Sequence, residues 1–252
     1  MKNKHIIIQA RTSSTRFPQK VIKKIGDDTL LGLVIKRVKK ATKVDQVIVA
    51  TSSNHSDDLI ENIAEELEVH VYRGSLEDVL DRYYQASVKY KSDIIIRITG
   101  DCPLIDPKLI DAIVERFEVE NLDYLSNTLD PKYPDGQDIE VFSFEALEKA
   151  WKFANLNSER EHVTPFIHKN SSYLGQTLFK ADNFDNPIGD YSDLRITVDN
   201  EEDFFVIQSL IKFGGINLTW ESYIDILTKN QLYKLNNKFL RNEGLVKSKE
   251  ND

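Results

Sequence analysis

The residues best suited to chemistry form one polar loop near the start of the chain, from Gln9 to Lys20. The loop carries Arg11, Arg16 and Lys20 together with four hydroxyl residues at positions 12–15. Guanidinium groups pair with phosphate oxygens at two points, lysine adds a point charge, and hydroxyl and backbone N–H groups donate further hydrogen bonds. Such a loop suits a triphosphate, although a solvated polar loop has the same composition. Walker A and G-x-G-x-x-G patterns are absent, which disfavours P-loop and dinucleotide chemistry.

Two aspartates, Asp101 and Asp199, come shortly after apolar runs at 94–98 and 194–198 that predict buried strands. Ligands of open α/β sheets collect beyond the carboxyl ends of the strands, so both carboxylates and the basic loop are expected at one crevice. Mg²⁺ is usually held by one or two carboxylates plus substrate phosphates. A metal there would stabilise negative charge while an acceptor oxygen attacks the α-phosphorus and pyrophosphate leaves. Taken singly, each aspartate has an alternative role as a helix N-cap or turn residue.

Strands and helices alternate through the first half of the chain and would position these residues. The predicted strands span residues 5–8, 47–50, 69–72 and 94–98, and the predicted helices span 30–41, 57–67, 75–90 and 106–119. Residues 75–78 match a capping box, and Asp106-Pro107 forms an N-cap followed by a first-turn proline. The alternation indicates βαβ units and therefore an α/β fold with a mostly parallel sheet.

The second half of the chain is less regular. Between about residues 124 and 179 we expect a strand at 138–142 and helices near 144–153 and 159–168. A core strand is expected at 194–198, followed by an amphipathic helix at 200–213 and a helical stretch after Thr219. The tail from about Asn242 is polar and is expected to fray.

Composition excludes several classes of function. The chain of 252 residues has a net charge of −8, which disfavours a general role in binding nucleic acid or anionic membranes. A single cysteine, Cys102, forms no intramolecular disulfide and fits a reducing compartment. Neither a signal-peptide core nor a run near the roughly 18 apolar residues of a membrane span is present. We therefore expect a cytoplasmic protein.

Ordered motifs from about Ile6 to Phe213 resemble the cytidylyltransferases that activate acidic sugars, the CMP-Kdo and CMP-sialate synthetases. The chain is most similar to their relative, the spore coat polysaccharide biosynthesis protein F family. The loop motif runs from Ala10-Arg11 through Ser14-Thr15-Arg16-Phe17-Pro18 to Lys20. The others are Arg73-Gly74-Ser75, Asp81-Arg82, Thr99-Gly100-Asp101-Cys102-Pro103, Gly136 with Asp138-Ile139-Glu140-Val141-Phe142, Glu159-Arg160-Glu161-His162-Val163-Thr164-Pro165, and Arg195 with Val198-Asp199.

The resemblance implies a three-layer, Rossmann-like nucleotide-diphospho-sugar transferase fold with a small inserted arm. It implies a single nucleotidyltransferase domain over residues 1–241, an inserted acceptor and dimerisation region at about 124–180, and a polar tail at 242–252. The activity implied is Mg²⁺-dependent transfer of CMP from CTP to a sugar, sugar acid or similar small acceptor, in the biosynthesis of cell-surface polysaccharide. A homodimer is implied as well.

The resemblance also implies roles for particular residues. The nucleotide-binding residues would be Ala10, Arg11, Ser14, Arg16, Lys20, Arg73, Asp81 and Gly100. Asp101 and Asp199 would bind the metal and, with Arg11 and Lys20, form the catalytic set. The chain departs from the family pattern at two positions, with Cys102 in place of an acidic residue and Gln19 in place of a glycine. These departures weaken the inference about which acceptor is used more than the inference of nucleotidyl transfer. A thiol is a poor ligand for Mg²⁺, so Cys102 is expected to be a packing residue.

Four residues of the middle region are candidates for binding the acceptor. Asp138 and Glu140 alternate with apolar residues, as in a half-exposed strand. Ser158-Glu159-Arg160-Glu161 matches a capping box, so helix initiation explains part of this motif, but it explains neither Arg160 nor His162. A structural role is the alternative for His162.

Other functions stay open at this level. One alternative is a nucleotidyltransferase that uses UTP or GTP, and another is an inactive nucleotide-binding homologue. Retention of Arg11, Lys20, Asp101 and Asp199 together argues against inactivity. A glycosyltransferase is disfavoured because no Asp-x-Asp motif follows a strand. The sequence does not name the acceptor.

Overall fold

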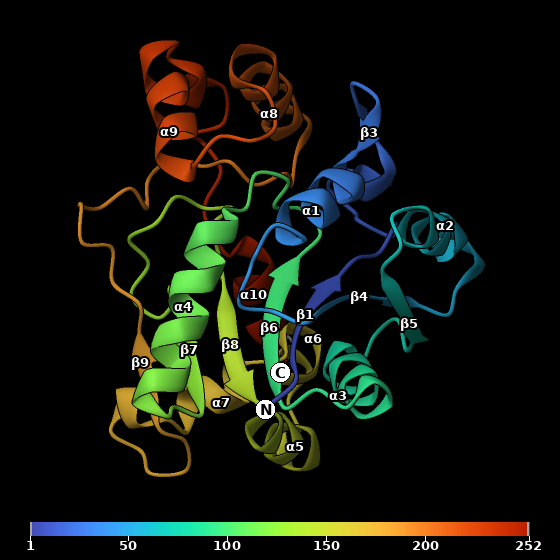
Figure 1. The fold of residues 1–252 in the computed structure, drawn as a ribbon, viewed down its shortest axis with the longest axis vertical. Coiled ribbons are helices and arrows are strands. Elements are labelled where there is room, and N and C mark those ends of the chain that lie inside the picture. Colours follow the sequence, from blue (N-terminus) through green and yellow to red (C-terminus); the bar gives the residue numbers. More distant parts are fainter. Residues whose placement is uncertain (1, 251) are drawn as a thin grey trace.

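The computed structural model describes residues 2–250 and 252 and is built on a seven-stranded sheet of order β5-β4-β1-β6-β8-β7-β9 (Figure 1). The strands are β1 (Lys4–Gln9), β4 (Gln46–Ser52), β5 (His70–Gly74), β6 (Ile94–Thr99), β7 (Tyr124–Ser126), β8 (Glu140–Ser143) and β9 (Ala181–Asn183). Strand β8 pairs antiparallel with both β6 and β7, and the other pairings are parallel. The predicted α/β class with a mostly parallel sheet is confirmed.

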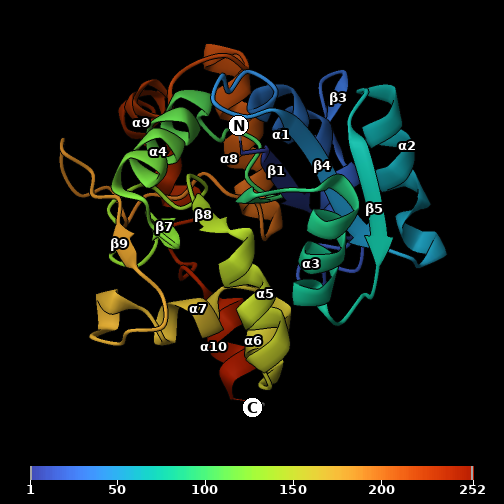
Figure 2. The ribbon, with the colours of Figure 1, turned by 60° about the horizontal axis from the view of Figure 1, so that its bottom comes forward.

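Helices cover both faces of the sheet and make three layers, as expected. One face packs on α1 (Leu30–Val38), α2 (Asp58–Glu66), α4 (Pro107–Glu120), α8 (Glu201–Gly214) and α9 (Trp220–Lys229). The other packs on α3 (Val79–Tyr90), α5 (Phe144–Phe153), α6 (Asn157–His162) and α7 (Pro165–Lys169), as Figure 2 shows from a second direction. Short elements complete the described chain: η1 (Lys20–Ile22), β2 (Lys24–Ile25), β3 (Asp28–Thr29), η2 (His55–Asp57), η3 (Ser172–Leu174), η4 (Leu232–Leu235) and α10 (Glu243–Lys249).

Alternation along the strands divides the core between these two faces. In β1, Ile6 and Ile8 are buried on one face while Ile7 is buried on the other. The same alternation places Ile95 of β6 on the same face as Ile7 of β1. Arg97 is two residues further along β6, so it lies on this face as well. The apolar packing on this face gives way to polar side chains toward the carboxyl ends of the strands, where the site lies.

Five predicted features differ from the structure. The capping box at 75–78 does not start α3, because the carboxylate of Asp78 accepts the N–H of Asp81 and caps the helix itself. The helix expected at 159–168 is two helices, α6 and α7, separated by Val163, which has a positive φ of 72°, and by Thr164. The box expected at 158–161 is likewise displaced, because the carboxylate of Glu159 accepts from Leu156 N (3.3 Å), and Leu156 is the N-cap.

The stretch 194–198 is not a regular strand. Among the described residues it makes one isolated parallel bridge, between Arg195 and Asp135. Ile196 and Val198 are nevertheless fully buried, which explains why the sequence pattern resembles a core strand. The polar tail also differs from expectation, because residues 243–249 form α10 and pack against α6. No helix in the described part of the chain is long and apolar enough to span a membrane.

Candidate functional site

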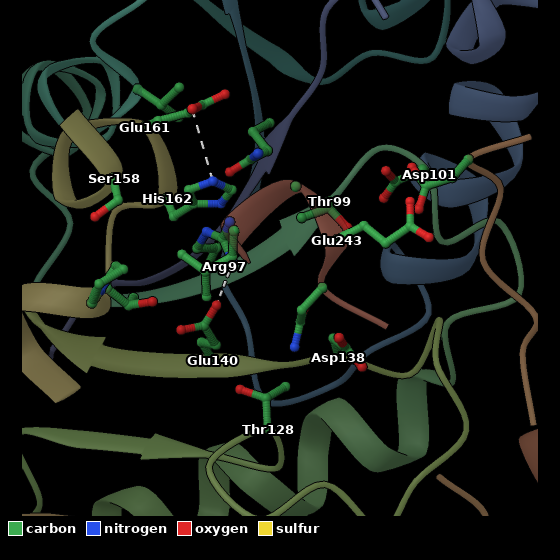
Figure 3. A pocket seen from close by; sticks show the side chains of 18 of the residues that line it. Arg97, Thr99, Asp101, Thr128, Asp138, Glu140, Ser158, Glu161, His162 and Glu243 are labelled. Carbon is green, nitrogen blue, oxygen red and sulfur yellow. Dashed lines mark hydrogen bonds and ion pairs between the residues drawn. The ribbon is translucent and has the colours of Figure 1, made fainter. Parts of the chain in front are cut away.

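A cavity of about 970 Å³ opens beyond the carboxyl ends of β1 and β6, between the sheet and helices α3, α6 and α10. The loop after β1 and the turn after β6 both reach it, as the parallel sheet predicts, and the segment before α8 reaches it as well. Figure 3 shows residues from these separate segments pointing into a common space, including Arg97, Thr99, Asp101, Glu140 and His162.

The basic loop is held in place by a buried carboxylate that lies outside it. Asp57 accepts hydrogen bonds from the backbone N–H of Thr12 (2.8 Å) and from the hydroxyls of Thr12 (2.6 Å) and Ser52 (2.5 Å). Burial acts to raise the pKa of Asp57, but these hydrogen bonds outweigh it and hold the pKa below its ordinary value. Because the loop is anchored at Thr12, its basic side chains project from a fixed base.

The ammonium group of Lys20 joins the loop to both predicted metal ligands. Its Nζ lies 2.8 Å from Asp101 Oδ2, 2.8 Å from Asp199 Oδ1 and 2.8 Å from the carbonyl oxygen of Val198. Lys20 is only 8% exposed. Burial acts to lower the pKa of Lys20, but Asp101 and Asp199 outweigh it and raise the pKa above its ordinary value. Three residues separated widely in sequence thus meet around one positive charge.

Asp199 is also held by arginines. Arg16 Nη2 lies 2.7 Å from its Oδ1, and Arg195 Nη2 donates to its Oδ2 at 2.7 Å. Burial acts to raise the pKa of Asp199, but Lys20, Arg16 and Arg195 together hold it far below its ordinary value. The carboxylate is therefore ionised and fixed in orientation.

The turn that carries Asp199 is built around a fully buried carboxylate, that of Asp203. It accepts the backbone N–H groups of Asp199 (3.0 Å) and Asn200 (2.9 Å), and Arg195 Nε donates to it at 2.9 Å. Arg195 also pairs with Asp135 across the isolated bridge. Burial, and next Asp138, raise the pKa of Asp135 to about 7. This network explains how a segment that is not a regular strand still positions its aspartate.

The residues present fit a hard divalent cation. Two carboxylates already share a single cationic group, Lys20 Nζ, at hydrogen-bond distance. Groups of three or more potential ligands are absent from residues 2–250 and 252, so two carboxylates would supply the protein's share and phosphates or water the rest. Cys102 is not part of this set, since its buried thiol contacts Thr99 Oγ1 at 3.2 Å and burial raises its pKa well above the ordinary value. Its expected packing role agrees with this environment.

Most of the residues expected to bind nucleotide line the cavity. Those that do are Ala10, Arg11, Ser14, Arg16, Lys20 and Gly100. At Gly100 an added Cβ would lie 3.0 Å from the carbonyl oxygen of Gln9, so glycine permits the turn after β6 to approach the end of β1.

Arg73 and Asp81 are the exceptions on the nucleotide side, because neither lines the cavity. Arg73 is used by its own neighbourhood: it pairs with Asp58 (2.7 Å) and Glu61 (2.7 Å). Asp81 accepts from Trp151 Nε1 at 2.9 Å. The structure therefore gives both side chains structural partners where the resemblance implies contacts with base or ribose.

On the acceptor side, Asp138, Glu140 and His162 line the cavity and Arg160 does not. Arg160 pairs with Asp78 and donates to the carbonyl oxygen of Trp151 (2.8 Å), which fixes the start of α3 against α5 and α6. Burial, and next Arg97, lower the pKa of His162, so its ring is neutral near pH 7. Its Nε2 is buried without a hydrogen-bond partner among the described residues.

Sequence reasoning missed two arginines of the cavity. Arg97 interrupts the isoleucine run of β6 and pairs with Glu140 on the adjacent strand β8 (Figure 3). The carboxylate of Glu140 also accepts a hydrogen bond from the hydroxyl of Tyr124 at 2.7 Å. Arg82 of α3 is 1% exposed, and its Nε and Nη1 have no hydrogen-bond partner in the described structure. A charged residue in phase with buried apolar residues was the available signal for Arg97.

The arrangement combines an anion-binding loop with a pair of carboxylates suited to a cation. Arg16 and Lys20 supply positive charge beside Asp101 and Asp199, and Arg11 lines the same cavity, where it pairs with Glu161 of α6 at 3.4 Å. The remaining space, beside Glu140, is polar and large enough for a second small molecule. Such a site suits the transfer of a phosphorylated group between a polyphosphate and a small acceptor.

Comparison with known proteins shows the family of the chain. A family model described as cytidylyltransferase matches residues 5–242. The chain is 42% identical to the uncharacterised protein MJ1063 of Methanocaldococcus jannaschii over 94% of this chain and 96% of that one. It is 33% identical to the spore coat polysaccharide biosynthesis protein SpsF of Bacillus subtilis, over 83% of this chain and 86% of that protein.

A solved structure extends the similarity to the whole fold. The structure of a cytidylyltransferase from Leptospira borgpetersenii superposes with a TM-score of 0.88 and 34% identity, covering 96% of this chain and all of the other. The matched region contains the basic loop, the two aspartates and the middle region. The chain belongs to the cytidylyltransferase family and is a nucleotidyltransferase.

Proposed function

We propose that the protein transfers CMP from CTP to a sugar, sugar acid or similar small acceptor and releases pyrophosphate, with Mg²⁺ as cofactor. The observation that carries the proposal is the meeting of Lys20, Asp101 and Asp199 at 2.8 Å contacts beside the basic loop. A polyphosphate needs positive charge along its length and a cation at the reacting phosphorus. This arrangement supports both needs at one place.

Each group has a defined task in this reaction. Arg11, Arg16 and Lys20 bind the phosphates and stabilise the negative charge that collects on the departing pyrophosphate. Asp101 and Asp199 hold Mg²⁺, which when bound supplies Lewis-acid stabilisation of charge at the α-phosphate. Preorganisation is high, because the carboxylate of Asp199 is already fixed by three cationic side chains.

The choice of CTP and of a carbohydrate acceptor is supported by the relatives. The family is described by its transfer of cytidylyl groups, and the Bacillus subtilis relative is named for polysaccharide biosynthesis. Asp138, Glu140 and His162 line the part of the cavity that remains for the acceptor. Carboxylates accept hydrogen bonds from hydroxyl groups, so these residues suit a polyhydroxylated molecule. Arg73, Asp81 and Arg160 are not included, because their partners lie outside the cavity.

A pyrophosphate-release screen tests the proposal. Four nucleoside triphosphates are each combined with Mg²⁺ and a panel of sugars, sugar phosphates and sugar acids. We expect turnover with CTP and a subset of the acceptors, and a loss of at least about 10²-fold for Asp101→Asn and for Asp199→Asn with the fold intact. Asp225→Asn, at an exposed position of α9, is the matched control. Normal turnover in either site variant would refute the metal assignment.

The same screen decides between the alternatives. Preference for UTP or GTP would show a nucleotidyltransferase of different base specificity. Binding of nucleotide without pyrophosphate release from any acceptor tested would favour an inactive homologue, against which the clustering of Lys20, Asp101 and Asp199 argues. Homodimer formation and a cytoplasmic location stay predictions from the sequence.

A further inference from the structure

Residues from the stretch 242–249, together with Asp252, form a wall of the cavity, and Arg241 leads into this C-terminal segment. Helix α10 lies within this segment and packs on α6, which carries residues of the acceptor side (Figure 2). Glu243, Leu245 and Lys247 are among the cavity-lining residues. The segment therefore faces the space that the substrates would occupy.

Both ends of this C-terminal segment are tethered away from the basic loop. At its start, Arg241 pairs with Asp138 and donates to the carbonyl oxygen of Tyr133 at 3.0 Å. At its end, Asp252 accepts the backbone N–H of Ser158 at 2.8 Å. These contacts hold the segment across the cavity without involving the loop.

A separate contact ties the middle of the segment to the nucleotide side. Glu243 Oε2 lies 3.3 Å from Arg16 Nη1, while the other terminal nitrogen, Arg16 Nη2, lies 2.7 Å from Asp199 Oδ1. The guanidinium is thus shared between two carboxylates. The side chains of Arg16 and Glu243 are 33% and 27% exposed, so water reaches the pair and an incoming anion has access to it. Figure 3 shows Glu243 reaching into the cavity on the same side as Asp101.

We propose that Glu243 and the phosphates of the nucleotide compete for Arg16, so that the C-terminal segment is a gate that nucleotide binding opens. The inference rests on the proposed function in one respect, that Arg16 binds phosphate. A phosphate pairs with a guanidinium at two points and with a larger charge than a carboxylate, so it displaces Glu243. Glu243 then faces a polyanion, and like-charge repulsion moves the first turn of α10 outward.

The tethers determine what moves. Arg241, Ser248 and Asp252 contact groups other than Arg16, and the Ser248 hydroxyl donates to Glu161 at 2.9 Å, so these residues stay in place while the first turn of α10 shifts. Asn242, between Arg241 and α10, has a positive φ of 61° and forms the bend where the helix begins. Because Arg241 stays paired with Asp138, opening begins at Glu243, beside Arg16.

Calorimetry on the full-length protein tests the competition. CTP with Mg²⁺ and, separately, inorganic triphosphate with Mg²⁺ are titrated into the wild type, Glu243→Gln and Glu118→Gln. Glu118 is the matched control, because it pairs with Lys4 at 3.1 Å outside the cavity lining. We expect Glu243→Gln to bind both ligands about two- to fivefold more tightly, the value of a partly exposed ion pair, and Glu118→Gln to match the wild type.

Hydrogen exchange gives a second readout that a merely structural role would not produce. Addition of CTP with Mg²⁺ should speed amide exchange over residues 243–249 of the wild type. Unchanged or weaker binding by Glu243→Gln, or slower exchange on adding CTP, would overturn the gate. Tight binding of triphosphate without preference for CTP would contradict the cytidine assignment alone, and the affinity ratio would still test the gate. Failure of both ligands to bind the wild type would refute both proposals.

Discussion

Replacing Lys20 by methionine removes the charge that holds Asp101 and Asp199 together. Methionine retains much of the apolar stem but leaves two carboxylates facing each other in a largely buried crevice. Removing one partner of a buried ion pair costs roughly 3–5 kcal/mol, because the remaining charge is left unpaired; here that charge is Asp101, since Asp199 keeps its contacts with Arg16 and Arg195. The side chains of Asp101 and Asp199 are 25% and 18% exposed, so solvent screens part of the repulsion and the lower end of that range applies.

The expected loss in the free energy of unfolding is therefore about 3 kcal/mol. For a chain of this size each kcal/mol lowers Tm by roughly 2–4 °C, so Lys20→Met should melt about 6–12 °C below the wild type. The variant also creates a better cation site, because Mg²⁺ no longer competes with the ammonium group. Saturation at 100 times Kd would return about 2.7 kcal/mol.

Differential scanning calorimetry with and without MgCl₂ measures both effects. Lys20→Met should regain most of its lost Tm in Mg²⁺, whereas the wild type should shift less. Lys36→Met is the control, because the Lys36 side chain pairs with Asp28 and is 42% exposed. This variant should lose at most about 1 kcal/mol of the free energy of unfolding, and its Tm should not respond to Mg²⁺. A Lys20→Met protein as stable as the wild type, or one that ignores Mg²⁺, would refute the reasoning.

Three further predictions follow from the structure. Arg97→Met leaves Glu140 buried without its cationic partner and should lower the free energy of unfolding, measured in urea, by about 3–5 kcal/mol. The double variant Arg97→Met with Glu140→Gln should recover much of this loss, and an equal loss in the single and double variants would contradict a buried ion pair. The pKa of Asp199 in the folded protein lies below its ordinary value of 3.8, so this carboxylate should contribute stability that is present above about pH 4 and is lost as the pH falls further. The free energy of unfolding of Asp199→Asn should therefore depend less on acid than that of the wild type, which chemical denaturation from pH 6 to 3 measures. Arg73→Met should lower the free energy of unfolding by roughly 1 kcal/mol and leave the affinity for CTP unchanged. A tenfold rise in the Kd for CTP, measured by calorimetry, would instead support the role in nucleotide binding that the resemblance implies.

The C-terminal segment and the stretch 194–198 show where local pattern misleads. Polar composition predicts a frayed end, yet α10 forms because Arg241 and Asp252 find partners on other elements. Apolar alternation predicts a strand at 194–198, yet burial alone produces that pattern, and the backbone N–H groups of Ile196 and Val198 donate to the carbonyl oxygens of Asp135 and Asp101, which lie outside the regular strands. Sequence reports which residues are buried, but not which contacts bury them.

The sequence by itself determined the layered α/β fold, because period-two strands and capped helices are local consequences of side-chain size and polarity. It also determined that the basic loop and Asp101 lie together, since the carboxyl ends of the parallel strands β1 and β6 share one edge of the sheet, whereas Asp199 reaches that edge from a segment that is not a strand of the sheet. Only the tertiary structure decided that Lys20 joins Asp101 to Asp199, and that Arg160 is used by Asp78. Those pairings depend on distances between residues far apart in the chain, which no local rule encodes.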